Sequence, residues 1–155
     1  MKGTFFVNGR AKEWSFVPEA TLLDVLRANG HSEVHRGCDE GVCGTCSVLL
    51  EGVLVNSCQV FAASVMEKEI ETVAGIGTIH EPHPLQKAFV ESGAVQCGFC
   101  TPAMILAALA LLRKNPNPND KEILSALDGN SCRCTGYVKI IEAVRLAARR
   151  MSSHD

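Results

Sequence analysis

The spacing of apolar residues changes about halfway along the chain, from strand-like runs to helical periodicity. Short β-type runs at residues 4–7, 12–17, 47–50, 53–55 and 70–73 are separated by turn residues, of which Asn8-Gly9 is the strongest hairpin signal. Between the second and third runs, Thr21 and Asp24 match the N-cap and capping-box positions of a helix that Gly30 would stop. The first half is therefore predicted to form a small sheet with one helix.

The C-terminal half carries the start and stop signals of four helices, after a joint marked by Gly75 and Gly77. A Thr101 N-cap with Pro at the next position would open the second of them, and Asn119 with Glu122 would cap the third. The predicted helices cover residues 84–91, 102–114, 120–127 and 137–151. The apolar side of the last helix is expected to be Val138, Ile141, Val144, Leu146 and Ala148.

Length and charge narrow the function classes. The chain has 155 residues, a net charge of −2 and 46% hydrophobic residues, which suits one domain or two small ones and gives no sign of nucleic-acid binding. Its longest apolar stretch, residues 103–112, is shorter than the roughly 20 residues of a membrane span and is either bundle core or a partner face. No secretory signal and no dinucleotide or P-loop fingerprint is found, so a cytoplasmic protein without its own flavin is expected.

Eight cysteines in such a chain indicate metal or redox chemistry, because disulfides are uncommon in a reducing compartment. The first set has the C-x4-C-x2-C…C spacing of plant-type [2Fe–2S] clusters. The glycines within it allow the loop to wrap closely around a cluster and to place backbone N–H groups near its sulfurs. The predicted ligands are Cys38, Cys43, Cys46 and Cys58, with Gly37, Gly41 and Gly44 as the loop glycines.

The second set is less specific on spacing alone. It consists of a C-x2-C pair, Cys97 and Cys100, and a C-x-C pair, Cys132 and Cys134, each in a turn at helix ends. The C-x-C pair is unusual for structural zinc, where C-x2–4-C is the common spacing. The four thiols are compatible with either zinc or a [2Fe–2S] cluster, and the residues by themselves do not decide between them.

Nearly the whole chain resembles the small iron–sulfur subunit or domain of the molybdenum hydroxylases, the family of xanthine dehydrogenase, aldehyde oxidoreductase and aerobic carbon monoxide dehydrogenase. The resemblance is carried by RGCDEGVCGTCSVLLEG at 36–52, VQCGFCTPAMI at 95–105 and NSCRCTGYVKII at 130–141. It implies an α+β fold, with a β-grasp plant-type ferredoxin domain in residues 1–77 and a small four-helix-bundle iron–sulfur domain in residues 78–155.

The resemblance also implies a function in electron transfer. Two [2Fe–2S] clusters would relay single electrons between a molybdopterin–molybdenum centre on a large subunit and FAD on a third subunit, with no catalytic residue on this chain. The second cluster, on Cys97, Cys100, Cys132 and Cys134, would be the one nearer to molybdenum. Gln96 and Cys134 would lie against the partner's molybdopterin.

Some residues depart from the family pattern without removing a ligand. Ser131 stands where the family often has Leu, and a hydrogen bond from it would alter the potential of the second cluster. His35 and Arg36 precede the first set in an atypical loop and are interpreted as solvated residues rather than as cluster-tuning ones. Two other functions stay open: a free ferredoxin-like shuttle with one cluster and a structural zinc, and a zinc protein with two four-cysteine sites.

Overall fold

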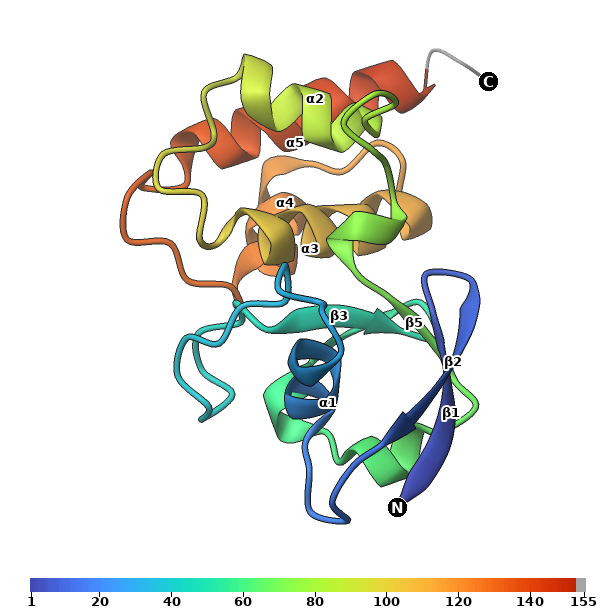
Figure 1. Cartoon of the computed structure of the whole chain (residues 1–155). Coiled ribbons are helices and arrows are strands. Elements are labelled where there is room, and N and C mark those ends of the chain that lie inside the picture. Colours follow the sequence, from blue (N-terminus) through green and yellow to red (C-terminus); the bar gives the residue numbers. More distant parts are fainter. Residues whose placement is uncertain (153–155) are drawn as a thin grey trace.

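The computed structural model describes residues 1–152 and contains one five-stranded sheet and five α-helices in that range. Figure 1 shows helices α2 to α5 gathered on one side of the sheet and α1 on the other. The sheet order is β2-β1-β5-β3-β4, in which β1 and β5 are parallel and the other pairs are antiparallel. The strands are β1 (Lys2–Val7), β2 (Arg10–Ser15), β3 (Ser47–Leu50), β4 (Val53–Asn56) and β5 (Glu69–Glu71).

Local signals placed the elements of this half well. Asn8 and Gly9 both have positive φ, as a two-residue hairpin turn requires, and they join β1 to β2. Helix α1 (Leu22–Ala28) begins with the expected capping box, in which Thr21 Oγ1 accepts from Asp24 N and Asp24 accepts from Thr21 N. The last strand differs from the prediction, because β5 ends at Glu71 and residues 73–75 form a 3-10 turn.

The four predicted helices are present as α2 (Pro84–Glu91), α3 (Thr101–Lys114), α4 (Asp120–Leu127) and α5 (Val138–Ser152). Two starts were wrong by one residue. Thr101 is already helical and Cys100 is the N-cap, without a side-chain hydrogen bond. Tyr137 cannot belong to α5, because its φ of +67° is left-handed.

The buried face of α5 also differs in part from the prediction. Val138 is 60% exposed, and Ile141 and Leu146 are only partly buried. Val144 and Ala148 are buried, as expected. The apolar positions that face the bundle are Ile140, Ala143, Val144, Ala147 and Ala148, which follow the helical spacing of three and four residues.

Two hydrophobic cores flank the sheet. One joins α1 to the inner sheet positions Phe5, Val48 and Ile70, and the other joins α2–α5 to Leu49 on the opposite face of β3. Residues 103–109 of α3 are all buried, so this apolar run is bundle core. Since adjacent residues of β3 point into different cores, the sheet and the bundle are held against each other through this strand.

Candidate iron–sulfur sites

The first cysteine set is assembled by the loop between α1 and β3 together with the turn after β4. The β3–β4 hairpin pairs Ser47 with Asn56, and this register brings Cys58 back beside Cys46. Ser57 fixes the return, because its N–H and its hydroxyl both donate to the carbonyl oxygen of Cys46, at 3.3 and 2.7 Å. A hairpin with this register is therefore what brings the fourth predicted ligand to the other three.

The thiols of this set interact in two pairs, Cys38 with Cys43 and Cys46 with Cys58. The backbone N–H of Glu40 donates to Cys38 Sγ at 3.4 Å. This hydrogen bond, followed by those from the side chain and backbone of Cys43 and from the backbone of Val42, lowers the pKa of Cys38 to about 7. Burial raises the pKa of Cys46 to about 11. The exposed side of the loop thus favours the thiolate that ligation requires, while the inner side shields the site from water.

The glycines of the loop meet a close-approach requirement. A Cβ at Gly37 would lie 2.6 Å from Thr45 Oγ1 and 2.9 Å from Cys43 Sγ. Gly44 has a φ of +71°, and a Cβ there would lie 2.1 Å from the carbonyl oxygen of Gly129. Gly41 is left-handed as well, with a φ of +75°. The first site therefore depends on close packing of the loop that only glycine permits.

The second cysteine set lies in two turns of the helical half. Cys97 and Cys100 precede α3, and Cys132 and Cys134 lie between α4 and α5. Cys97 Sγ is 3.6 Å from Cys134 Sγ, and the thiol of Cys100 interacts with that of Cys132. Among residues 1–152, no group of three or more His, Cys, Asp or Glu side chains is gathered to hold a metal ion. In each set the four thiols therefore form two pairs. Two thiolates per iron is the ligation of a [2Fe–2S] cluster held by four cysteines.

Hydrogen bonds and burial differ along the second set. Burial raises the pKa of Cys132, but the Thr135 hydroxyl 3.1 Å from its sulfur and two backbone N–H groups outweigh it, so the pKa falls to about 7. Burial raises the pKa of Cys100 to about 12. The hydrogen bond that the Cys134 thiol donates to Cys97, and then the charge of Cys97, raise the pKa of Cys134. One pair of thiols is therefore on the surface and the other faces the bundle.

Gln96 lies at this surface as well. Gln96, Cys97 and Cys134 are all exposed, whereas Cys100 is buried. Gln96 adjoins Cys97, whose sulfur is the one closest to Cys134. The structure thus brings together the two residues predicted to lie against a partner's molybdopterin.

Backbone contacts join the two sites directly. The N–H of Ser131 donates to the carbonyl oxygen of Cys43 at 2.9 Å, and the Asn130 side chain donates to the carbonyl oxygen of Gly44 at 3.0 Å. The Tyr137 hydroxyl accepts from Cys132 N and donates to Asn130 O, both at 3.0 Å. Ser131 was expected to add a hydrogen bond near the second set, whereas its backbone N–H bonds Cys43 of the first set.

Two functional residues were missed or misread in the sequence. His35 was interpreted as solvated, yet its ring stacks on Phe99 and bonds its carbonyl oxygen. His83 received no role, yet it is the N-cap of α2, where its Nδ1 accepts from Leu85 N at 3.2 Å. The Pro at position 84 signalled a helix start, but histidine is not a usual N-cap residue.

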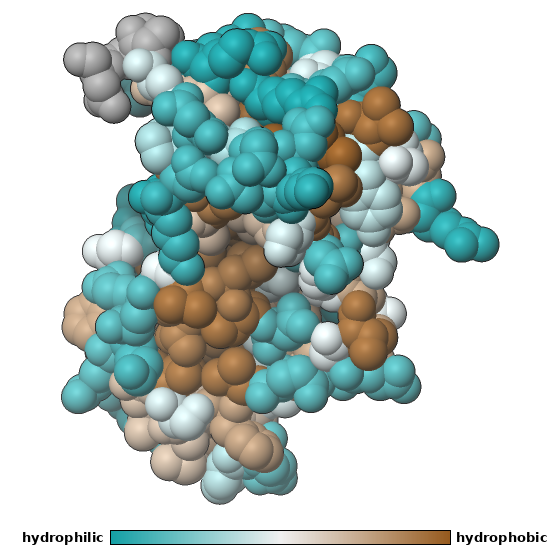
Figure 2. All heavy atoms as spheres, turned by 180° about the vertical axis from the view of Figure 1, so that it is seen from behind, coloured by the Kyte–Doolittle hydropathy of each residue, from teal (hydrophilic) through white to brown (hydrophobic). Residues whose placement is uncertain are grey.

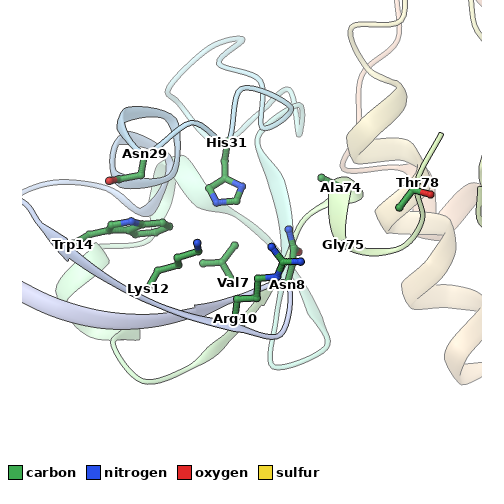
Figure 3. A pocket seen from close by; sticks show the side chains of 10 residues that line it. All are labelled: Val7, Asn8, Arg10, Lys12, Trp14, Asn29, His31, Ala74, Gly75 and Thr78. Atoms are coloured by element: carbon green, nitrogen blue, oxygen red, sulfur yellow. The ribbon is translucent and has the colours of Figure 1, made fainter. Parts of the chain in front are cut away.

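A cavity of about 470 Å³ lies at the β1–β2 hairpin (Figure 3). Arg10, Lys12 and Trp14 of β2 line it from one side and His31 from the other, while Gly75 and Thr78 contribute from the segment after β5. No cysteine of either set lines it. The cavity is therefore not part of the proposed iron–sulfur sites.

Two protein-family models match consecutive parts of the chain. A 2Fe-2S iron-sulfur cluster binding domain matches residues 5–72, and a [2Fe-2S] binding domain matches residues 72–145. The nicotinate dehydrogenase small FeS subunit of Eubacterium barkeri is 48% identical over 148 residues, covering 95% of this chain and 94% of that one. The xanthine dehydrogenase iron-sulfur-binding subunit of Escherichia coli O157:H7 is 42% identical, covering 89% and 88%.

Solved structures agree with these matches. Quinoline 2-oxidoreductase from Pseudomonas putida 86 has a chain that superposes with a TM-score of 0.91 at 37% identity, covering 97% of this chain and 96% of that one. Aldehyde oxidoreductase from Desulfovibrio desulfuricans ATCC 27774 gives a TM-score of 0.95 at 39% identity, covering 99% of this chain and 17% of that one. The chain belongs to the small iron–sulfur subunits of the molybdenum hydroxylase family, as an electron-transfer subunit with two [2Fe–2S]-binding domains.

Proposed function

We propose that this chain relays single electrons between a molybdopterin–molybdenum centre on a large partner subunit and a flavin on another partner. The first [2Fe–2S] cluster would be bound by Cys38, Cys43, Cys46 and Cys58, in a ferredoxin-like domain of residues 1–77. The second would be bound by Cys97, Cys100, Cys132 and Cys134, in a helical domain of residues 78–155. Bound clusters supply one-electron redox chemistry, and the chain supplies ligation, burial and hydrogen bonds that set their potentials.

The observation that carries this proposal is the hydrogen bond from Ser131 N to Cys43 O. Cys43 is a proposed ligand of the first cluster, and Ser131 is the neighbour of Cys132, a proposed ligand of the second. One hydrogen bond and a few covalent bonds therefore separate the two ligand sets. This short connection favours a two-cluster relay over two independent metal sites.

The exposed residues of each site support an order of the two sites between the partner subunits. Cys97, Cys134 and Gln96 open onto the surface at one site, which suits contact with a molybdopterin on the large subunit. At the other site the Cys38 side of the loop is outermost, with Val42 68% exposed, which suits an approach by the flavin subunit. We place substrate recognition on the partner subunits, since the cysteine-bearing loops are arranged around their own thiols.

Apolar surface supports assembly with partners. Figure 2 shows apolar side chains gathered into a patch at the level of the sheet, on the face opposite to that of Figure 1. Near the second cysteine set, Val95 and Phe99 are 40% and 44% exposed, and Val138 is 60% exposed. Exposed apolar groups of this kind mark protein–protein contacts.

No helix among residues 1–152 has both the length and the apolarity of a membrane span. The cytoplasmic location stays a prediction.

The test is the content of iron, zinc and acid-labile sulfide per full-length chain, with EPR of the dithionite-reduced protein. About four irons, about four sulfides and two distinguishable rhombic signals are expected for two [2Fe–2S] clusters. About two irons with one zinc would instead support the ferredoxin-like shuttle. A colourless preparation with zinc alone would overturn both.

A further inference from the structure

A histidine from the loop of the first site contacts the loop of the second. His35 lies three residues before Cys38, and Phe99 lies between Cys97 and Cys100. The two rings are stacked, with centroids 4.5 Å apart and planes 13° from parallel. His35 Nδ1 is 2.7 Å from the carbonyl oxygen of Phe99. One side chain therefore makes both an apolar and a polar contact with the Cys97–Cys100 turn.

The histidine is held from its own loop. Its carbonyl oxygen accepts from Thr45 Oγ1 at 3.5 Å, and Thr45 Oγ1 is also 3.2 Å from Cys43 Sγ. The next residue, Arg36, forms ion pairs with Asp24 and Asp39. These contacts anchor residues 35 and 36 to α1 and to the first cysteine loop, so the ring reaches the second turn from a fixed base.

The hydrogen bond has a defined direction. A carbonyl oxygen can only accept, so Nδ1 of His35 carries the hydrogen and donates it. The Phe99 carbonyl and the Cys100 N–H belong to the same peptide group, whose C–N bond has partial double-bond character. A donor at the oxygen draws electron density towards it and leaves the Cys100 N–H more positive, as in other polarised hydrogen-bond chains.

We propose that His35 is a positioning residue that raises the reduction potential of the second cluster from the loop of the first. The stacked ring fixes the Phe99–Cys100 peptide, and the Nδ1 hydrogen bond strengthens its dipole next to the Cys100 sulfur. Hydrogen bonds and positive dipoles near cluster sulfurs stabilise the more negative, reduced cluster. This inference rests on the proposed function, because it needs a cluster on Cys100.

The test is an EPR-monitored redox titration of the full-length chain with its clusters, comparing three variants. His35→Phe keeps a stacked ring and lacks the N–H, so the second rhombic signal should titrate at a more negative potential while the first stays in place. His35→Gln keeps an amide donor without an aromatic ring, and part of the shift should be reversed. His80→Phe, at an exposed histidine before α2, should change neither potential.

The outcomes separate the two proposals. Wild-type protein with both signals, and an unchanged second potential in His35→Phe, would overturn the inference and leave the relay intact. Wild-type protein without a second rhombic signal would count against the relay itself. If His35→Phe lost its clusters, Phe99→Leu would be measured instead. This variant removes the stacking and keeps both the histidine donor and the carbonyl acceptor. The potential of its second cluster should therefore stay closer to the wild-type value than that of His35→Gln. A larger shift in Phe99→Leu than in His35→Gln would overturn the inference.

Discussion

The backbone N–H of Ser131 donates to the carbonyl oxygen of Cys43 across 2.9 Å, although the two residues belong to different cysteine-bearing loops. The contact is close because Gly44 presents no side chain to residues 129 and 130. Asn130, which is buried, completes it by donating to the carbonyl oxygen of Gly44. The relative position of the two sites is thus set by main-chain packing, which depends on glycine at position 44 and not on the side chain at position 131.

Removing this N–H should loosen the connection between the sites. Ser131→Pro lacks the donor, and the loss of one hydrogen bond should lower the free energy of unfolding by about 1 kcal/mol. The magnetic interaction between the two reduced clusters should also weaken in EPR. Ser131→Ala is the matched control, because it keeps the N–H and removes only an exposed hydroxyl. Equal spectra for the two variants would show that the hydrogen bond does not hold the sites together.

Replacing Gly44 tests the same packing from the other side. Gly44→Ala places a Cβ 2.1 Å from the Gly129 carbonyl oxygen at a φ of +71°, so both strain and a clash are expected. Gly52→Ala, at a φ of +79° with no atom within 4 Å, has the strain alone. Left-handed strain costs on the order of 1 kcal/mol, and Gly44→Ala should lose clearly more than Gly52→Ala in urea unfolding. Equal losses would mean that the loops move apart freely.

Local sequence signals predicted much of this fold, because the interactions behind them lie within a few residues. The capping boxes at Thr21 with Asp24 and at Asn119 with Glu122 are formed as expected. The cysteine spacing likewise predicted which thiols of the first set lie together, since they are on one loop and at the two ends of a hairpin. Such features depend on covalent proximity, which the sequence contains directly.

Contacts that follow no periodic sequence pattern account for what sequence reasoning did not predict. Tyr137 was placed in the last helix because its neighbours follow a helical pattern, but its hydroxyl bonds Cys132 N and Asn130 O and holds it left-handed instead. His35 was interpreted as solvated because nothing near it in the sequence binds it, and its partner Phe99 is 64 residues away. Neither relationship leaves a periodic trace, so only the packed structure reveals it.

Substitution of Cys134 tests the independence of the two ligand sets. Cys134→Ser should abolish or shift the second rhombic signal, because a serine hydroxyl is a poorer iron ligand than a thiolate, and should leave the first signal unchanged. Cys43→Ser is the reciprocal variant and should affect the first signal. The measurement is EPR with iron content on folded protein. Loss of both clusters from Cys134→Ser while the fold persists would contradict the ligand assignment.

The N-cap of α2 makes stability depend on pH. Burial, and then the charge of Arg113, lower the pKa of His83 below its usual value of 6.5, and only the neutral ring can accept from Leu85 N. The unfolded chain therefore binds more protons than the folded one at mildly acidic pH. The contribution of His83 is present above about pH 6.5 and is lost as the pH falls through the lowered pKa.

Two substitutions separate capping from titration at this position. His83→Asn keeps an acceptor that does not titrate, so its melting temperature should fall less than that of the wild type between about pH 7 and about pH 5. His83→Ala should lose about 1 kcal/mol at pH 7, because the cap is absent. The measurement is thermal unfolding followed by circular dichroism. If His83→Asn and the wild type lost the same stability on acidification, protonation of His83 would not be the cause, and the loss would belong to groups that both proteins share.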